Sequence, residues 1–214
     1  AHHPEKGYFK VSQMCIGYGT IGALLLDLAI TNDVTFENER LLLRGNAGSS
    51  DQATSDIIAA IRSSSKPRKL RYWVSKLGNR PGKYKWAVLG GIEAKKMLRI
   101  ETKKFLGLIP YRNTYLTETR TRYELIQHLR SGILYHKEIN DETVSILGLI
   151  EACRMHRHLT SDRDELKTIR KELKQIIKES PIADTIGKTI KEVQAAVIAA
   201  VIASSAASTA ASSH

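Results

Sequence analysis

One stretch near the start of the chain is apolar on nearly every side. Residues 17–30 combine leucines and isoleucines with small residues, and Asp27 is their only charged side chain. A helix that is packed by neighbours all round has this composition, because none of its faces needs to be polar. The pattern therefore predicts a buried, glycine-rich helix at the centre of the core.

Shorter elements follow this helix. Residues 34–44 have the pattern of a short extended pair, and Asp51 is placed to cap a helix that runs to about Ile61. Apolar residues then recur at helical spacing over residues 68–77 with basic residues between them, which predicts a basic amphipathic helix. Pro81 fits the first turn of the next helix, because it has no backbone N–H to lose there.

The second half of the chain predicts one β-hairpin and then helices only. Residues 97–116 have an alternating pattern around Gly107, which is typical of a hairpin. We expect helices over Thr119–Leu134, Asp141–His158, Asp162–Glu179 and Pro181–Ser204. The expected fold is thus mostly α, with a helical core and one protruding hairpin. Residues 1–204 form a single domain in this prediction, and 205–214 are a low-complexity Ala/Ser tail.

Charge is concentrated in one fifth of the sequence. The formal net charge of the chain is +11, and residues 62–104 hold fourteen basic residues against two acidic ones, which leaves −1 for the rest. The basic residues are Arg62, Lys66, Arg68, Lys69, Arg71, Lys76, Arg80, Lys83, Lys85, Lys95, Lys96, Arg99, Lys103 and Lys104. A solvated face is the ordinary reading of a charge run, but a cluster of this size favours an anionic partner.

Composition narrows the class of protein. With 26% charged residues the chain is too polar for an integral membrane protein. Its apolar runs, Ile21–Ile30 and Ala195–Ala203, fall short of the ~20 residues that span a bilayer. Cys15 and Cys153 lie in apolar helical patterns and are expected to be free thiols, which favours a reducing, cytoplasmic setting.

Motifs for catalysis or metal binding are absent from the sequence. It contains no phosphate-binding glycine loop, no HExxH and no paired CxxC. His156 and His158 are two residues apart, so on a helix their rings point to different sides, and a solvated helix end is preferred over a metal site. We expect neither an enzyme nor a cofactor.

The basic segment also contains features that suit a membrane surface. Aromatic residues, among them Trp73 and Trp86, accompany the lysines, as they do at lipid interfaces. The hairpin tip is expected to present four apolar residues, namely Phe105, Leu106, Leu108 and Ile109. Membrane contact and packing against a second subunit are equally good interpretations of this tip.

Four stretches resemble, in order, the Golgi phosphoprotein 3 family. They are Glu5–Ala29, which contains Gly-Tyr-Gly-Thr-Ile-Gly, then Gly91–Ile100, Asp141–Ala152 and Ala196–Val201. The resemblance covers nearly the whole chain and implies a mostly helical domain with a protruding hairpin. It also implies a basic pocket, which in eukaryotic members binds phosphatidylinositol 4-phosphate. Family members begin with a further leucine-rich helix, so this chain is expected to start late.

The resemblance places the family's pocket on residues that have mostly changed. Its tryptophan falls on Ser12, one arginine on Ile21, and two further arginines on Gly82 and Lys85. The headgroup-binding residues implied by the resemblance are therefore Lys85, with Lys83 and Arg80 as near neighbours. A lysine lacks the two-pronged geometry that arginine offers a phosphate, which favours a less selective binder of anionic phospholipid surfaces. These departures indicate a distant member of the family, of bacterial type. We expect the protein to be peripheral to a membrane, and in a eukaryote this would be the cytosolic face of the Golgi.

A nucleic-acid-binding protein is the alternative. A helix followed by the basic hairpin has the order of a winged helix, and the basic segment would then contact phosphates. The helix before the hairpin, however, contains Gly90 and Gly91 and few side chains that could reach base edges. The apolar tip favours the membrane over DNA.

Overall fold

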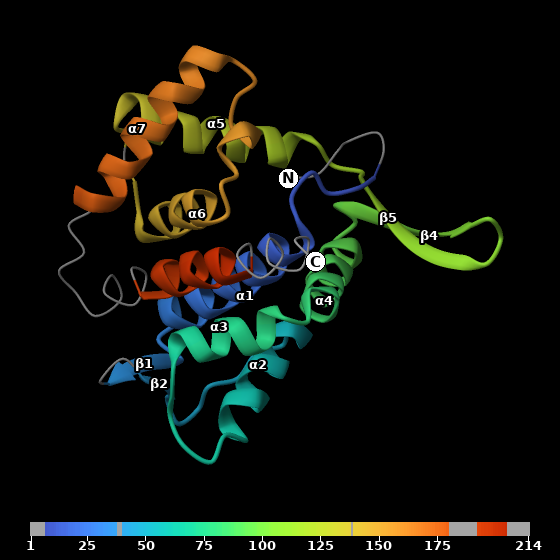
Figure 1. Cartoon of the computed structure of the whole chain (residues 1–214), viewed down its shortest axis with the longest axis vertical. Coiled ribbons are helices and arrows are strands. Elements are labelled where there is room, and N and C mark those ends of the chain that lie inside the picture. Colours follow the sequence, from blue (N-terminus) through green and yellow to red (C-terminus); the bar gives the residue numbers. More distant parts are fainter. Residues whose placement is uncertain (1–6, 38–39, 138, 180–191, 205–214) are drawn as a thin grey trace, which may run out of the picture.

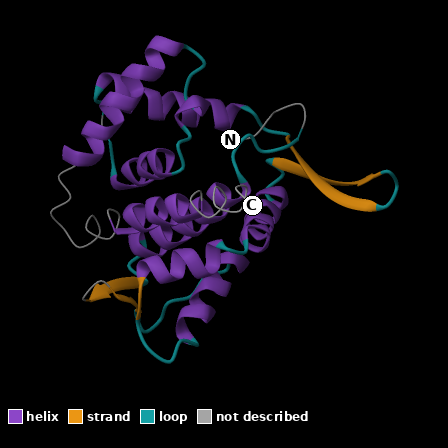
Figure 2. Ribbon diagram, in the orientation of Figure 1, coloured by secondary structure: helices purple, strands orange, loops and turns teal. Residues whose placement is uncertain are grey.

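The computed structural model describes residues 7–37, 40–137, 139–179 and 192–204. Helices dominate these residues, and strands form only two small antiparallel sheets (Figure 2). The predicted fold class, mostly α with one protruding hairpin, is confirmed. The predicted helix start at Pro181 and the tail 205–214 lie outside the described residues.

The helices and strands of the described residues have the following bounds. The helices are α1 (Gln13–Ile30), α2 (Gln52–Arg62), α3 (Leu70–Gly78), α4 (Pro81–Ala94), α5 (Arg120–Tyr135), α6 (Asp141–Ala152), the one-turn 3-10 helix η1 (His156–His158), α7 (Arg163–Glu179) and the helix Glu192–Ser204. The strands are β1 (Val34–Glu37), β2 (Arg40–Leu43), β3 (Arg68–Lys69), β4 (Leu98–Phe105) and β5 (Ile109–Leu116).

Helix α1 is the centre of the main core, as predicted. The Ser12 side chain caps it by accepting a hydrogen bond from the backbone N–H of Cys15 at 3.1 Å. Helices α3, α4 and α6 pack around it (Figure 1). Gly17 allows the backbones of α1 and α3 to lie close together, because a Cβ atom there would lie 2.6 Å from the carbonyl oxygen of Gly78 at the end of α3. The small residues of the apolar stretch therefore serve close helix packing.

By length and composition, α1 could also cross a membrane. The predicted apolar stretch Ile21–Ile30 is too short to span a bilayer, whereas α1 extends over 18 residues. Half of the apolar window is buried inside the protein, as in the core helix of a globular domain. Packing against α3, α4 and α6 is thus sufficient to explain why α1 is apolar.

A second hydrophobic cluster joins α5, α6 and α7. Its buried side chains include Leu129, Ile133, Leu147, Ile169 and Leu173. Helix α6 lies between this cluster and α1, so it contributes to both cores (Figure 1). The two clusters therefore form one continuous helical body.

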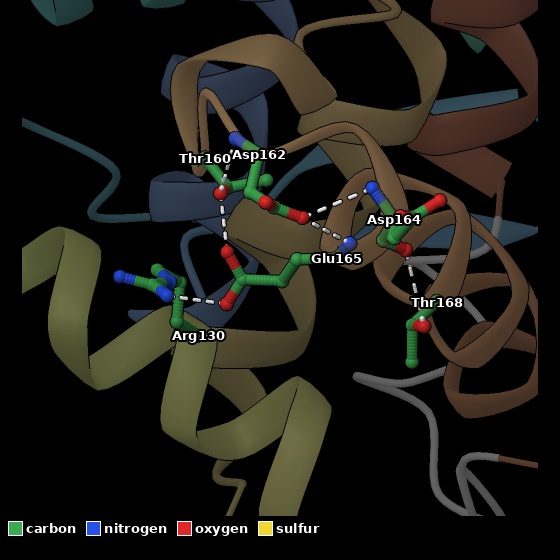
Figure 3. A network of polar contacts seen from close by, with 6 residues as sticks. All are labelled: Arg130, Thr160, Asp162, Asp164, Glu165 and Thr168. Carbon is green, nitrogen blue, oxygen red and sulfur yellow. Dashed lines mark hydrogen bonds and ion pairs between the residues drawn. The ribbon is translucent and has the colours of Figure 1, made fainter.

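A polar network fixes the start of α7 against α5 (Figure 3). The Asp162 carboxylate caps α7 by accepting hydrogen bonds from the backbone N–H groups of Asp164 at 2.9 Å and Glu165 at 2.7 Å. The Glu165 carboxylate accepts hydrogen bonds from Thr160 and from Arg130 on α5. These two bonds lower the pKa of Glu165 because they favour its charged form.

The region before α3 contains a strand that the sequence analysis missed. The extended pair β1–β2 and the cap of α2 by Asp51 are confirmed. The predicted helix over 68–77, however, begins only at Leu70, because Arg68 and Lys69 are extended and pair with β2. Pro67 precedes them, and their ladder to β2 replaces the helical hydrogen bonds that they would otherwise make.

The predicted helix Asp141–His158 is also shorter than expected. Helix α6 ends at Ala152, and Arg154 has a left-handed backbone with a φ of 53°. The chain then forms η1, in which buried His156 shares a 2.5 Å hydrogen bond with Glu151. Burial of His156 and Met155 against the cores turns the chain away from the helix axis, which local periodicity does not reveal.

Strands β4 and β5 form the predicted hairpin. Residues pair from Leu98 with Leu116 at its base to Phe105 with Ile109 near its tip. The base is tied to the body through the backbone N–H of Thr114, which donates to the Gly7 carbonyl at 2.9 Å. The outer half projects away from the helices, on the right of Figure 1.

Candidate functional site

The predicted headgroup residue Lys85 lies on α4 and faces the start of α1. Its ammonium group donates a 2.9 Å hydrogen bond to Gln13 Oε1, and it lies 4.5 Å from the centre of the Trp86 ring and 5.7 Å from that of Phe9. Only 8% of Lys85 is exposed. This burial lowers its pKa, because a charge loses hydration there.

Trp86 connects this lysine to the hairpin. The Arg112 guanidinium, on β5, lies 5.2 Å from the centre of the Trp86 ring. Trp86 is therefore in contact with one cation from α4 and one from the hairpin, and cation–π attraction stabilises both contacts. We call Phe9, Gln13, Lys85, Trp86 and Arg112 the basic–aromatic cluster. It lies where the hairpin leaves the body.

The structure does not bring the three predicted headgroup residues together. Lys83 forms a 2.8 Å ion pair with Asp56 on α2, which lowers the pKa of Asp56 and raises that of Lys83. Arg80 is exposed at the cap position that precedes α4. Lys85 instead faces α1. Residues two positions apart on a helix point to different sides, so Lys83 and Lys85 do not share a pocket although they are close in sequence.

The positions where the resemblance predicted lost pocket residues have structural roles. Ser12 caps α1, as described above, and Ile21 is completely buried in the core. Gly82 lies on the first turn of α4, where a Cβ atom would be 4.0 Å from Trp86. Lys85 is thus the only charged residue at the four positions that correspond to the family's pocket.

The four apolar residues at the end of the hairpin are strongly exposed. Their exposed fractions are 59% for Phe105, 81% for Leu106, 83% for Leu108 and 63% for Ile109, and we call them the apolar tip. Leu106 has a left-handed backbone, with a φ of 48°, and Gly107 follows at 74°. A leucine is strained in this conformation. The chain therefore keeps a large apolar side chain where an exposed turn would favour glycine or asparagine.

Cations flank the apolar tip. Lys103 and Lys104 precede it on β4, and Arg112 follows it on β5. Lys103 donates a 2.9 Å hydrogen bond to the Tyr115 hydroxyl, which raises the pKa of Lys103, and its ammonium lies 3.4 Å from Glu101. The outer hairpin thus combines an apolar end with basic sides.

Sequence reasoning missed part of the cluster. Phe9 and Gln13 were not assigned a role, although both lie within the stretch Glu5–Ala29 that resembles the family. Arg112 lies outside the basic segment 62–104 and was not predicted as a site residue. Trp86 follows Lys85 directly, and this adjacency was the available signal for the cation–π pair. The contacts to Phe9 and Arg112 depend on the fold, and no pattern among neighbouring residues in the sequence predicts them.

His156, His158 and the two cysteines lie in packed surroundings. His156 is buried and bonded to Glu151, while burial lowers the pKa of half-buried His158 to about 4. Both cysteines are free thiols, as predicted, with Cys153 buried and Cys15 partly so. Within the described ranges, no group of three His, Cys, Asp or Glu side chains is arranged to hold a metal ion.

The fold and site define a class: a mostly helical protein whose basic hairpin carries an exposed apolar tip. A comparison with protein-family models agrees with the family resemblance found in the sequence. The family model described as Golgi phosphoprotein 3 (GPP34) matches residues 1–193, which is most of the chain. The chain therefore belongs to the Golgi phosphoprotein 3 family, which confirms the resemblance found in the sequence. No curated protein matches it.

Proposed function

We propose that this protein binds anionic phospholipid surfaces from outside the bilayer, with the hairpin as the contact. The apolar tip is the observation that carries the proposal. Burying a leucine or phenylalanine side chain contributes roughly 2 kcal/mol, so four strongly exposed ones lose several kcal/mol of burial free energy in water. Insertion into the interfacial region of a membrane would recover it.

The flanking cations support an anionic surface in particular. Each lysine or arginine near such a surface contributes about 1 kcal/mol of attraction. Lys103 and Lys104 are exposed and close to the tip in the strand register, so they would reach the lipid headgroups when the tip inserts. Charge and apolar surface thus act at the same end of the hairpin.

Buried Lys85 favours a binder with little headgroup selectivity. Its ammonium group is already bonded to Gln13 and has little exposed surface for a phosphate, and a single ammonium cannot hold a phosphate from two sides as arginine does. In this proposal Lys85 holds Trp86 at the base of the hairpin. Lys83 and Arg80 do not act together with Lys85 in this proposal. The proposed function includes no catalytic step. We expect a peripheral protein of the cytoplasm, or of the cytosolic Golgi face in a eukaryote.

Vesicle flotation tests the proposal. We expect the protein to float with vesicles that contain phosphatidylglycerol and to stay unbound with neutral phosphatidylcholine. Replacing Lys103 and Lys104 by Gln removes about 2 kcal/mol of attraction, or roughly 30-fold in affinity. The control replaces Lys171 and Lys174 on α7 by Gln, which changes the net charge equally. Equal losses in both pairs would mean that only net charge matters, and absence of flotation would refute the proposal.

Two further arms separate the alternatives. Vesicles with phosphatidylinositol 4-phosphate, matched in total charge, should bind no more tightly than those with phosphatidylglycerol. If the protein clearly prefers vesicles with phosphatidylinositol 4-phosphate and Lys85→Gln abolishes this preference, then Lys85 does recognise the headgroup. The nucleic-acid alternative remains a prediction, and duplex DNA that removes the protein from vesicles at equal phosphate concentration would favour it.

A further inference from the structure

The basic segment contains a second group of cations, away from the hairpin. A cavity of about 510 Å³ lies beside β3 and the start of α3. None of its described lining residues is acidic. Five are cationic, namely Arg40, Lys66, Arg68, Lys69 and Arg71. Strand β3 pairs with β2, and β1–β2 lie on the opposite side of the molecule from the hairpin (Figure 1). This cavity is therefore separate from the candidate membrane contact.

Pairing of β3 with β2 gathers these cations. Arg40 lies opposite Lys69, and Leu41 opposite Arg68. The Arg40 guanidinium also donates a 3.2 Å hydrogen bond to the carbonyl oxygen of Pro67. The pairing thus brings Arg40 close to cations that lie 28 and 29 residues later in the chain, and an anion in the cavity would reduce their repulsion. On its other side, Arg40 lies opposite Glu37 of β1.

Arg68, in the wall of this cavity, has a buried donor without an acceptor. Its Nε atom is buried and has no hydrogen-bond partner among the described residues, while its guanidinium lies 5.0 Å from the centre of the Tyr72 ring. A buried donor without an acceptor is costly and uncommon. Trp73 Nε1 is a second such donor, in the wall of an adjoining cavity of about 340 Å³ that shares Lys66 and Pro67 with the first.

We propose that the cavity beside β3 binds a small anion that carries two or more phosphate groups. Arginine guanidinium groups offer paired N–H donors that match phosphate oxygens, and Arg40, Arg68 and Arg71 supply three such groups. A single phosphate would offset only part of the positive charge of Arg40, Lys66, Arg68 and Arg71, which favours a ligand with several negative charges. The cavity is within the size range of small-molecule sites.

Calorimetric titration of the whole chain with inorganic pyrophosphate tests this site at low salt. We expect saturable binding that Arg68→Gln weakens by about tenfold or more. Because Arg68 is partly buried, circular dichroism must show that this variant is folded. The pair Lys66→Gln and Arg71→Gln, both exposed, provides a second variant with the same expected loss. The control pair Lys171→Gln and Lys174→Gln changes the net charge equally and should bind as the wild type does.

Three results would overturn the proposal. They are no binding heat from the wild type up to millimolar pyrophosphate, unchanged binding by the Lys66 and Arg71 pair, and an equal loss in the α7 control pair.

The source of the phosphates is decided separately with vesicles that contain phosphatidylinositol 4-phosphate. If Arg68→Gln weakens flotation as well as pyrophosphate binding, the ligand is a lipid headgroup; if flotation is unchanged, it is a soluble polyphosphate. Because pyrophosphate binding needs no membrane, it can succeed even where vesicle binding fails.

Discussion

Replacing the two most exposed leucines of the apolar tip should separate membrane binding from folding. Leu106 and Leu108 are 81% and 83% exposed, and full burial of a leucine side chain contributes about 2 kcal/mol. The double variant Leu106→Asn and Leu108→Ser would then lose about 3 kcal/mol of insertion free energy. This corresponds to roughly a hundredfold weaker partition into vesicles.

The same substitutions should leave the folded state intact. Exposed positions change the free energy of unfolding by about 0.5 kcal/mol or less. Asparagine also tolerates the left-handed backbone of residue 106, where φ is 48°, better than leucine does. We therefore expect an unchanged or slightly higher melting temperature, so that any loss of vesicle binding reports on the tip itself.

The assay is co-sedimentation with increasing amounts of phosphatidylglycerol vesicles at physiological salt. Tyr135→Ser provides the control, because Tyr135 is 70% exposed at the far end of α5 and should not contact the membrane. Light scattering on the same samples measures the oligomeric state. A tip variant that binds vesicles like the wild type but changes from dimer to monomer would refute membrane insertion and assign the tip to a subunit interface.

Two further predictions concern the stability of the helical body. Glu165→Gln should lower the free energy of unfolding at neutral pH by about 2 kcal/mol, because it weakens the hydrogen bonds from Arg130 and Thr160. Since the pKa of Glu165 is lowered in the folded state, this difference should narrow in urea titrations as the pH falls below about 4. His158 has a folded pKa of about 4, so the unfolded chain takes up its proton first, and stability should fall between pH 6.5 and 4. His158→Gln should reduce this fall by about 1 kcal/mol, allowing for the partial exposure of His158, and identical pH profiles would contradict the assignment.

Local patterns in the sequence were sufficient for most of the helices and for the hairpin. The cap of α2 by Asp51, the start of α4 at Pro81 and the hairpin around Gly107 each depend on residues close together in the chain. The errors arose where distant contacts prevail. Arg68 and Lys69 are extended because they pair with β2, and α6 ends early because the following residues turn back to the cores.

The sequence by itself determined that this chain is strongly basic over residues 62–104, that it carries an apolar hairpin tip, and that it resembles its family in order. Only the tertiary structure decided how the cations are divided. Lys85 is directed to Gln13, 72 residues away, and Lys83 to Asp56, while the cations around β3 line a separate cavity. The net charge of a segment can be summed from its sequence, but the direction of each side chain depends on the partners that folding brings close to it. One basic segment therefore became two separate surfaces.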